Sequence, residues 1–458
     1  MAKVKNYMVQ NIGIGIGMQI LYLVVSFGIR TIFIQILGKE ILGLDRLFTN
    51  IITLISFAEL GIGEAIIFQI YSPLVKKNNQ KVRDFLLFYR KIYRYIGSII
   101  MLLGVLLLPV VWNFSLLGSA NNGEVSIIYL LYVANAGVSY FFVYRKALFF
   151  VTQKEYINVM FKQGGFCIQS LLQGIYLFQT HDLIGYLVIQ LVCMLAFNWI
   201  QSYYAYKSYP EFLKGKPEKL STEEISSIKK NMQGIVLYMA GGYLITGTES
   251  IFITAFIGLS TAGVYANYTL IINAVVSILA RAMRGLIGSI GQITARENKE
   301  EAFKLFKKIY KTTILVYFFI SLGLILLLNP FIKIWLGSNY LLGQQVVLII
   351  ALQFFVTGLQ YPSYLFRTAL GLYQKGKWSP VILMTVYLLG SFLLIPKFGV
   401  VGSALSIAIG RLMSTTWVDP FLVFKSYFNK SCFRFILRQY VIIICFIILE
   451  IILYFLFY

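Results

Sequence analysis

The chain alternates along its whole length between long apolar stretches and short polar ones. Each apolar stretch has about 20 residues or more, the length at which an α-helix crosses a hydrocarbon core of about 30 Å. Because lipid offers no hydrogen-bond partner to the backbone, each stretch is expected to be a helix. The pattern predicts thirteen spans, at residues 12–37, 44–70, 93–112, 124–145, 156–178, 182–206, 234–258, 263–291, 312–335, 343–370, 378–396, 399–424 and 440–458.

Composition agrees with a chain embedded in lipid. Of the 458 residues, 59% are hydrophobic and only 13% are charged, and the mean hydropathy is +0.77. Water-soluble domains carry about twice that share of charge. We therefore expect an all-α polytopic membrane protein without a large soluble domain. The cysteines lack the spacing of metal ligands and no phosphate-binding glycine loop occurs, so neither a metal nor a cofactor is predicted.

The formal net charge of +22 is carried mainly by connections between the spans. Basic connections alternate with connections that are nearly free of Lys and Arg, as the positive-inside rule requires. The rule places the basic connections and the N-terminus in the cytoplasm. It also explains the charge without a nucleic-acid partner.

The second half of the chain repeats features of the first half about 220 residues later. The matching segments are 37–43 with 257–263, 88–93 with 305–310, and 152–154 with 373–375. The repeat predicts two six-helix bundles around a central cavity, as parallel repeats related by an axis along the membrane normal. The expected domains are an N-terminal bundle (1–206), a cytoplasmic linker (207–233), a C-terminal bundle (234–424), and a basic cytoplasmic segment with an additional membrane helix (425–458).

Several arginines lie inside the predicted spans, where a cation on a lone helix costs about 2.5–3.5 kcal/mol. They are therefore expected to face water, a partner or a ligand. Two helical stripes are polar and are expected to face the cavity: Gln19, Tyr22, Ser26 and Arg30, and Asn273, Ser277, Arg281, Arg284 and Gly288. Because a guanidinium group can bind phosphate oxygens with two parallel hydrogen bonds, these cations predict a site for an anionic headgroup. The predicted cationic site consists of Arg30, Arg281, Arg284, Arg411 and, at the start of the second span, Arg46.

Other side chains in the spans have two readings. Tyr22, Tyr268 and Asn273 are candidates for sugar contacts, and Glu249 and Glu59 are candidates for coupling transport to an ion. The alternative for the charged residues is structural, because an arginine paired with Glu59, Glu64 or Glu249 would only join two helices.

Residues 85–94 and 303–311 combine an apolar face with several Lys and Arg side chains. Such a segment is expected to lie along the inner leaflet and to attract anionic membrane lipids. An ordinary basic end of a membrane span has the same composition, and both interpretations remain open.

Three segments carry a family resemblance: Ala58-Glu-Leu-Gly-Ile-Gly63, Tyr71-Ser-Pro-Leu74 and Phe88-Tyr-Arg-Lys-Ile-Tyr93. With the repeat and the linker, the chain resembles Wzx-type flippases of the multidrug/oligosaccharidyl-lipid/polysaccharide (MOP) exporter superfamily. The resemblance implies that the chain moves an undecaprenyl-pyrophosphate-linked oligosaccharide to the outer leaflet of a bacterial cytoplasmic membrane by alternating access. It also implies a role in capsule or surface polysaccharide synthesis and polymerase or other polysaccharide-assembly proteins as partners.

The related lipid II flippases line their cavity with arginines on early spans and on span eight. This likeness implies a substrate role for Arg30, Arg281 and Arg284. The thirteenth span departs from the twelve or fourteen of most relatives.

Two other functions compete with a flippase. A cation-coupled multidrug exporter of the same superfamily would share the fold and the repeat, but its cavity should be acidic or apolar. A membrane polysaccharide polymerase or glycosyltransferase would need paired catalytic carboxylates or a large extramembrane loop, and neither is evident in the sequence. We therefore expect a transporter and no enzyme.

Overall fold

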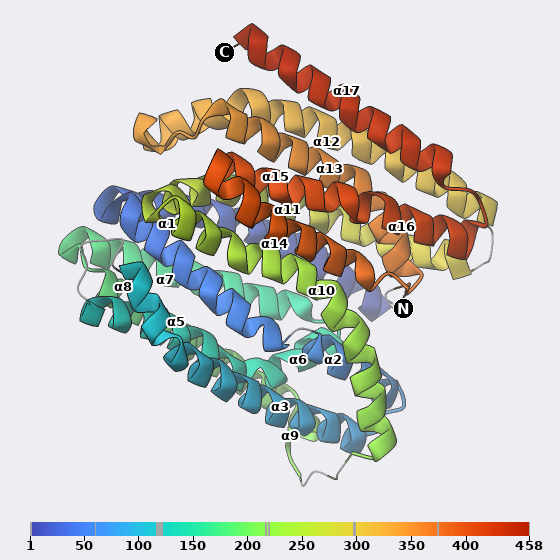
Figure 1. Ribbon diagram of the computed structural model, residues 1–458. Helices are drawn as coiled ribbons and strands as arrows, with labels where there is room; N and C mark the ends of the chain where they lie inside the picture. Colours follow the sequence, from blue (N-terminus) through green and yellow to red (C-terminus); the bar gives the residue numbers. More distant parts are fainter. Residues whose placement is uncertain are drawn as a thin grey trace. The chain divides into compact units, whose positions relative to one another are not determined.

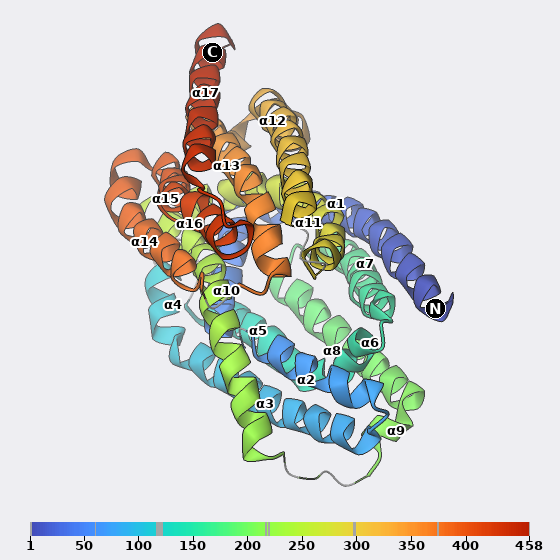
Figure 2. The ribbon, with the colours of Figure 1, turned by 90° about the vertical axis from the view of Figure 1, so that its right-hand side faces the viewer.

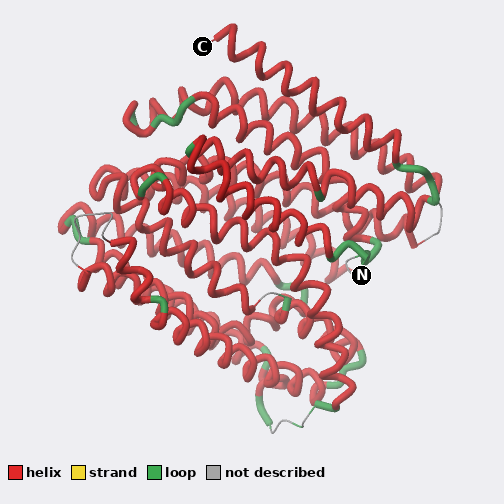
Figure 3. Tube along the Cα trace, viewed as in Figure 1, coloured by secondary structure: helices red, strands yellow, loops and turns green. Residues whose placement is uncertain are grey.

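The computed structural model describes residues 2–59, 61–115, 122–215, 218, 220–295, 299–372 and 375–457. The elements within these ranges are helices joined by short turns (Figure 3). Two compact units divide the chain, Met1–Val236 and Leu237–Tyr458. The boundary lies inside one long helix, α10 (Thr222–Phe256).

The first unit consists of long helices and several short ones (Figure 1). Its elements are α1 (Ala2–Ile55), η1 (Ser56–Glu59), α2 (Ile62–Val75), α3 (Asn79–Leu106), α4 (Leu108–Ser115), α5 (Asn122–Ser139), η2 (Tyr140–Phe142), α6 (Val143–Val151), α7 (Glu155–Thr180), α8 (Leu183–Ser208) and α9 (Pro210–Leu213). Helix α1 covers the first predicted span and part of the second. Between them Gly38 leaves the helical conformation (φ 80°) and lets the chain change direction. Gly258, its counterpart in the repeat, also has a positive φ (130°), directly after α10.

The second unit continues from α10 with α11 (Leu259–Ala295), α12 (Lys299–Leu336), η3 (Ser338–Tyr340), α13 (Gln344–Ala369), α14 (Trp378–Phe398), α15 (Val400–Met413), α16 (Thr415–Val423), the π-helical turn η4 (Phe424–Phe428) and α17 (Phe433–Phe457). Helices α13 and α17 lie side by side (Figure 2). Phe355 and Phe446 stack there with ring centroids 4.2 Å apart. The additional C-terminal helix is thus part of the core of this unit.

Eight helical segments among the described residues are long and apolar enough to cross a membrane. One of them, Gly13–Ile55, contains the first predicted span and part of the second. The predicted spans that are not among the eight coincide with α3, α7, α10 and the pair α15 and α16. The chain is a multi-pass, all-helical membrane protein.

Three polar segments of the sequence are continuous with long helices. The basic segments 85–94 and 303–311 are not separate helices but the first parts of α3 and α12. Part of the predicted linker, from Thr222 onward, is already helical as the start of α10. Polar composition does not distinguish a separate segment from the end of a membrane helix that extends beyond the hydrocarbon core.

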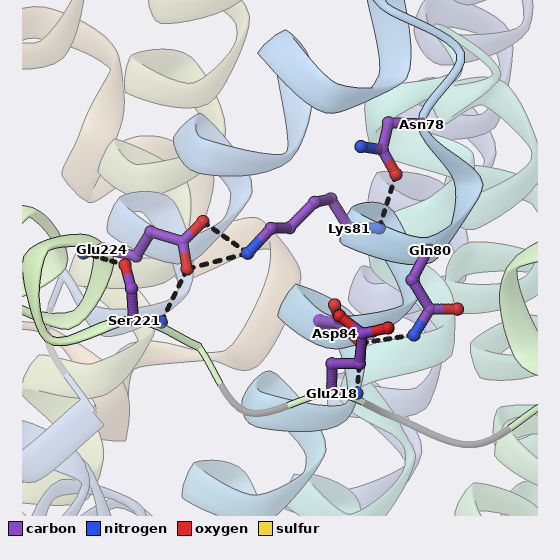
Figure 4. Close-up of polar contacts among 7 residues, drawn as sticks. All are labelled: Asn78, Gln80, Lys81, Asp84, Glu218, Ser221 and Glu224. Carbon is purple, nitrogen blue, oxygen red and sulfur yellow. Dashed lines mark hydrogen bonds and ion pairs between the residues drawn. The ribbon is translucent and has the colours of Figure 1, made fainter.

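The linker is attached to the first turns of α3 by three polar contacts, and Figure 4 shows the two that involve Lys81 and Asp84. The Lys81 ammonium lies 2.9 Å from Oε1 of Glu224, and the backbone N–H of Glu218 donates to Oδ1 of Asp84 at 2.8 Å. The Arg83 guanidinium donates to the carbonyl oxygen of Glu211 at 2.8 Å. These contacts hold the linker within the first unit.

Candidate functional site

The predicted site residue Arg30 lies in the first unit and is half-buried. Its Nη1 is 3.5 Å from Oδ2 of Asp45, on the second arm of α1 beyond the Gly38 kink. The hydroxyl group of Tyr132, from α5, donates a hydrogen bond to the other oxygen of Asp45. The charge of Arg30 is therefore balanced by a carboxylate that the sequence interpretation had not considered. Arg46, next in the chain to Asp45, is also half-buried and its positive charge acts on Arg30.

The polar stripe that leads to Arg30 packs inside the first unit. Gln19 is 8% exposed and accepts a hydrogen bond from Nε2 of Gln163 at 2.8 Å. The ring of Tyr22 lies 4.7 Å from that of Phe166, and both partners belong to α7. Both side chains thus contact α7, and the role of Tyr22 in binding a sugar stays a prediction.

The second predicted span is not one continuous helix. It changes to a 3-10 turn at Ser56–Glu59, passes through Gly61 in the left-handed conformation (φ 73°), and resumes as α2. Helices broken within membranes occur where the freed backbone groups line a cavity or find partners in protein, and such breaks are frequent at ion and substrate sites. The break places Glu59 beside α3, a position that a continuous helix would not produce.

Glu59 lies at the edge of a cavity of about 340 Å³ in the first unit. Its Oε1 accepts a hydrogen bond of 3.0 Å from the hydroxyl group of Tyr93. Tyr89 and Tyr93 pack edge to face with ring centroids 4.4 Å apart, and both line the cavity. The carboxylate thus accepts a hydrogen bond from a phenol at the edge of the cavity, a setting in which a proton or metal cation could be exchanged. Its coupling role stays a prediction.

Glu249 has a similar setting in the second unit. It is 8% exposed, and its Oε1 accepts a hydrogen bond of 2.7 Å from the hydroxyl group of Tyr265. Tyr268, one turn further along α11, is fully buried, and its hydroxyl group binds Asn329 and accepts the backbone N–H of Leu342 at 2.8 Å. With its hydroxyl group already engaged, Tyr268 serves the packing of α11 and is not open to a sugar.

The remaining candidates on α11 are only partly described. The side chains of Arg281 and Arg284 lie outside the described part of the structure, so their role stays a prediction. Asn273, two turns earlier, is exposed. Its side chain remains available for a contact with a polar ligand.

Arg411 is set at a second break. Helix α15 ends at Met413, Ser414 has a non-helical backbone (φ −130°, ψ −87°), and α16 begins at Thr415. The carbonyl oxygen of Arg411, freed by this break, accepts hydrogen bonds from the hydroxyl group of Thr416 at 2.9 Å and from Nε2 of Gln360 at 3.5 Å.

The side chain of Arg411 contrasts with its well-bonded backbone. Its Nε is buried and has no hydrogen-bond partner among the described residues. Tyr317 of α12 lies close enough to interact with the guanidinium group electrostatically, but a phenol carries no charge at neutral pH. A guanidinium nitrogen that is buried inside a membrane unit without an acceptor is costly unless an anion or water reaches it.

One buried ion pair was missed by the sequence interpretation. Arg367, the last basic residue of α13, binds Asp419 of α16, and their side chains are 1% and 4% exposed. Arg367 lies at the end of a predicted span, where a basic residue is ordinary. The nearby Gly376 would have been a weak signal, because a Cβ there would lie 3.1 Å from the Arg367 guanidinium group.

No protein-family model matches this sequence, and no curated protein is similar to it in sequence. Solved structures do match. An inward-facing multidrug resistance MATE family transporter of the MOP superfamily aligns with a TM-score of 0.67 at 13% identity, over 93% of this chain and 95% of that one. The chain has the fold of a MATE transporter.

Two further structures agree. The Vibrio cholerae MATE transporter VcmN aligns with a TM-score of 0.64 at 12% identity, over 94% of this chain and 99% of that one. A MATE in complex with Br-NRF aligns with a TM-score of 0.56 at 14% identity, over 95% and 96% of the two chains. At these identities the likeness establishes a MOP-type transporter fold, and the substrate must be argued from the side chains.

Proposed function

We propose that this chain is a flippase that carries an undecaprenyl-pyrophosphate-linked oligosaccharide across a bacterial cytoplasmic membrane. The observation that carries the proposal is the guanidinium group of Arg411, whose Nε is buried without a hydrogen-bond partner among the described residues. A pyrophosphate supplies the negative charge and the oxygen acceptors that this group needs. A cationic drug would supply neither.

The other candidate cations rank behind Arg411. Arg30 is already compensated by Asp45, so it would bind a substrate phosphate only by exchanging one anion for another. The substrate role of Arg46, Arg281 and Arg284 stays part of the proposal and rests on their positive charge in the sequence.

Coupling to an ion gradient would involve the two tyrosine-held carboxylates. Glu59 and Glu249 each accept a hydrogen bond from a phenol, and Glu59 also lies at a helix break. A carboxylate in this setting can bind a proton or a small cation in one conformation and release it in another. Alternating access then follows if binding at such a site favours one conformation over the other.

A cation-coupled multidrug exporter remains the second candidate, and the same two carboxylates favour it. The structural neighbours include multidrug resistance transporters. An exporter of cationic drugs would use Glu59 or Glu249 to attract its cargo, whereas the flippase would use them only for coupling. The two functions therefore differ in what Arg411 does.

The test uses the purified full-length protein and undecaprenyl pyrophosphate as the probe, with binding measured by native mass spectrometry. We expect Arg411→Ala to weaken binding by about tenfold or more and Arg411→Lys to weaken it less, because one charge-assisted contact contributes about 1.5–3 kcal/mol. Arg434→Ala, an exposed arginine of the same unit, is the matched control and should bind as the unmodified protein does. Undiminished binding by Arg411→Ala, together with efflux of ethidium by intact cells, would replace the flippase with the exporter.

A further inference from the structure

A groove of about 830 Å³ lies along the first half of α3 in the first unit. One wall carries Arg90, Lys91 and Arg94, followed by Tyr95 and Ser98. The opposite side is closed by residues of η2 and of the segment after α9. Its volume falls in the range of ordinary ligand pockets, which is about 300–1,000 Å³.

The charge of the groove is of one sign. The three cations fall within two turns of one helix, and its described lining includes no carboxylate. Asp84, nearly two turns before Arg90, is buried and accepts the backbone N–H of Glu218, so it does not compensate them. Nε of Arg90 is buried without a hydrogen-bond partner among the described residues, while its guanidinium group lies 5.6 Å from the ring centre of Tyr144. Nε of Arg90 can therefore donate a hydrogen bond to an anion that enters the groove.

An apolar stripe continues from these cations along α3. Tyr95, Ile99, Leu102 and Leu106 follow Lys91 at intervals of four, eight, eleven and fifteen residues, so all share its face of the helix. Their exposed fractions are 62%, 45%, 60% and 63%. A cationic pocket at one end of an apolar stripe has the shape and polarity of a lipid, with a charged headgroup above a hydrocarbon chain.

We propose that this groove is a binding site for an anionic phospholipid. The phosphodiester group lies among Arg90, Lys91 and Arg94, with one acyl chain along the stripe. The loop charges predict that this end of α3 lies at the inner leaflet, where anionic lipids attract basic residues. The site differs from the transport site argued above and does not depend on the identity of the transported molecule.

The second unit offers a matched surface for comparison. Helix α12, the counterpart of α3 in the repeat, carries Lys304, Lys307 and Lys308 near its start, and all three are exposed. Lys307 lies over the ring of Phe303, 4.9 Å from its centre. These lysines have the same total charge as the cations of the groove, and they differ in geometry. Comparing variants of the two surfaces therefore distinguishes binding at a specific site from a general attraction of anionic lipid to positive charge.

The experiment is native mass spectrometry of the full-length protein titrated with phosphatidylglycerol, and with phosphatidylcholine in parallel. We expect saturable binding of phosphatidylglycerol, weakened about 25-fold in Lys91→Gln/Arg94→Gln at about fivefold for each charge. Both residues are exposed, so the variant should fold normally, which thermal unfolding checks. The control Lys304→Gln/Lys308→Gln should change binding by less than about twofold. Leu102→Asn should also weaken binding, because the chain contact is lost.

Three results would overturn the proposal. Equal loss in both double variants would show attraction by charge alone. Equal binding of phosphatidylcholine would show that the phosphate charge is not recognised. Competition by glycerol phosphate as strong as by the intact lipid would show a soluble phosphate site without a role for the apolar stripe.

Discussion

Arg30 and Asp45 lie on opposite sides of the kink at Gly38, and their side chains meet at 3.5 Å across it. The pair joins the two arms of α1, and Tyr132 adds a hydrogen bond from α5 to the same carboxylate. Arg30 was selected from the sequence for its positive charge, and its neighbour Asp45 carries a negative charge that balances it. The function of Arg30 and the stability of the first unit are consequently linked.

Breaking this pair should destabilise the protein moderately. Asp45→Asn leaves Arg30 half-buried beside a neutral partner, and the side chains are 17% and 26% exposed, so water partly compensates the lost charge. We expect a loss of about 1–3 kcal/mol, measured by unfolding in mixed micelles. The double variant Arg30→Gln/Asp45→Asn should recover part of that loss. A double variant less stable than the sum of the single ones would show that the two residues do not act as a pair.

The pair of Arg367 and Asp419 should contribute more to stability than the pair in α1 does, because it is almost completely buried. Asp419→Asn leaves a guanidinium group without its counter-charge, and such changes cost about 3–5 kcal/mol. Replacing both partners by apolar residues, as in Arg367→Met/Asp419→Leu, should cost much less. Unfolding in mixed micelles measures both variants. If Asp419→Asn were no less stable than Asp45→Asn, burial would not be the property that sets the cost.

The close packing around Glu59 gives a third prediction. A Cβ on Gly63 would lie 2.6 Å from the hydroxyl oxygen of Tyr93 and 3.0 Å from that of Tyr89. Gly63→Ala should therefore push Tyr93 away from Glu59 and cost about 1–3 kcal/mol. Adding Tyr93→Phe removes the nearest atom and should restore stability, as measured by thermal unfolding.

The control for this prediction is Gly28→Ala, also within a membrane helix, where an added Cβ meets no other atom within 4 Å. It should leave stability unchanged or raise it slightly. If Tyr93→Phe failed to improve Gly63→Ala, the clash would involve Tyr89 or the backbone instead.

The attachment of the linker should depend on pH in a defined way. The hydrogen bond to Glu224 raises the pKa of Lys81, so its contribution is complete below 10.5 and is lost as the pH rises through the raised value. Burial pushes the pKa of Glu224 up, but the hydrogen bonds from Lys81 and Ser221 outweigh it and lower the pKa. Its contribution is complete above 4.5 and is lost as the pH falls through the lowered value. The contact should therefore hold between these limits.

Hydrogen exchange of residues 218–226, corrected for the intrinsic effect of pH, measures this attachment. Glu224→Gln should speed exchange at neutral pH by a few-fold, since a partly exposed ion pair contributes no more than about 1 kcal/mol. Glu223→Gln removes an equal charge from the same first turn of α10 and serves as the control. Equal acceleration by both variants would assign the effect to the helix dipole rather than to Lys81.

Much of the fold followed from the sequence, because the hydrophobic effect in lipid imposes helices of a fixed length. The spans at 156–178 and 182–206 agree with α7 and α8 to within a few residues. The break in the second span was missed because its signal, Gly61 and Gly63, is equally common in continuous membrane helices. Glycine permits a break in a helix, but whether a break forms depends on packing against neighbouring helices, which here includes Tyr89 and Tyr93 of α3.

The charged residues were found more easily than their partners. Arg30 and Arg411 stood out because cations are rare in apolar stretches. Asp45 and Asp419 did not, since a carboxylate near a predicted span end is ordinary. Partner choice depends on distances between helices that are remote in sequence, and these distances are fixed by packing that no local pattern records.

The interrupted second span also bears on how the protein is made. Backbone groups released at Ser56–Gly61 need protein partners inside lipid, and the tyrosines that close this region belong to α3, which leaves the ribosome later. The segment can therefore enter the bilayer before it can adopt its final conformation. The order of synthesis thus places this segment in the chain before the residues that pack against it.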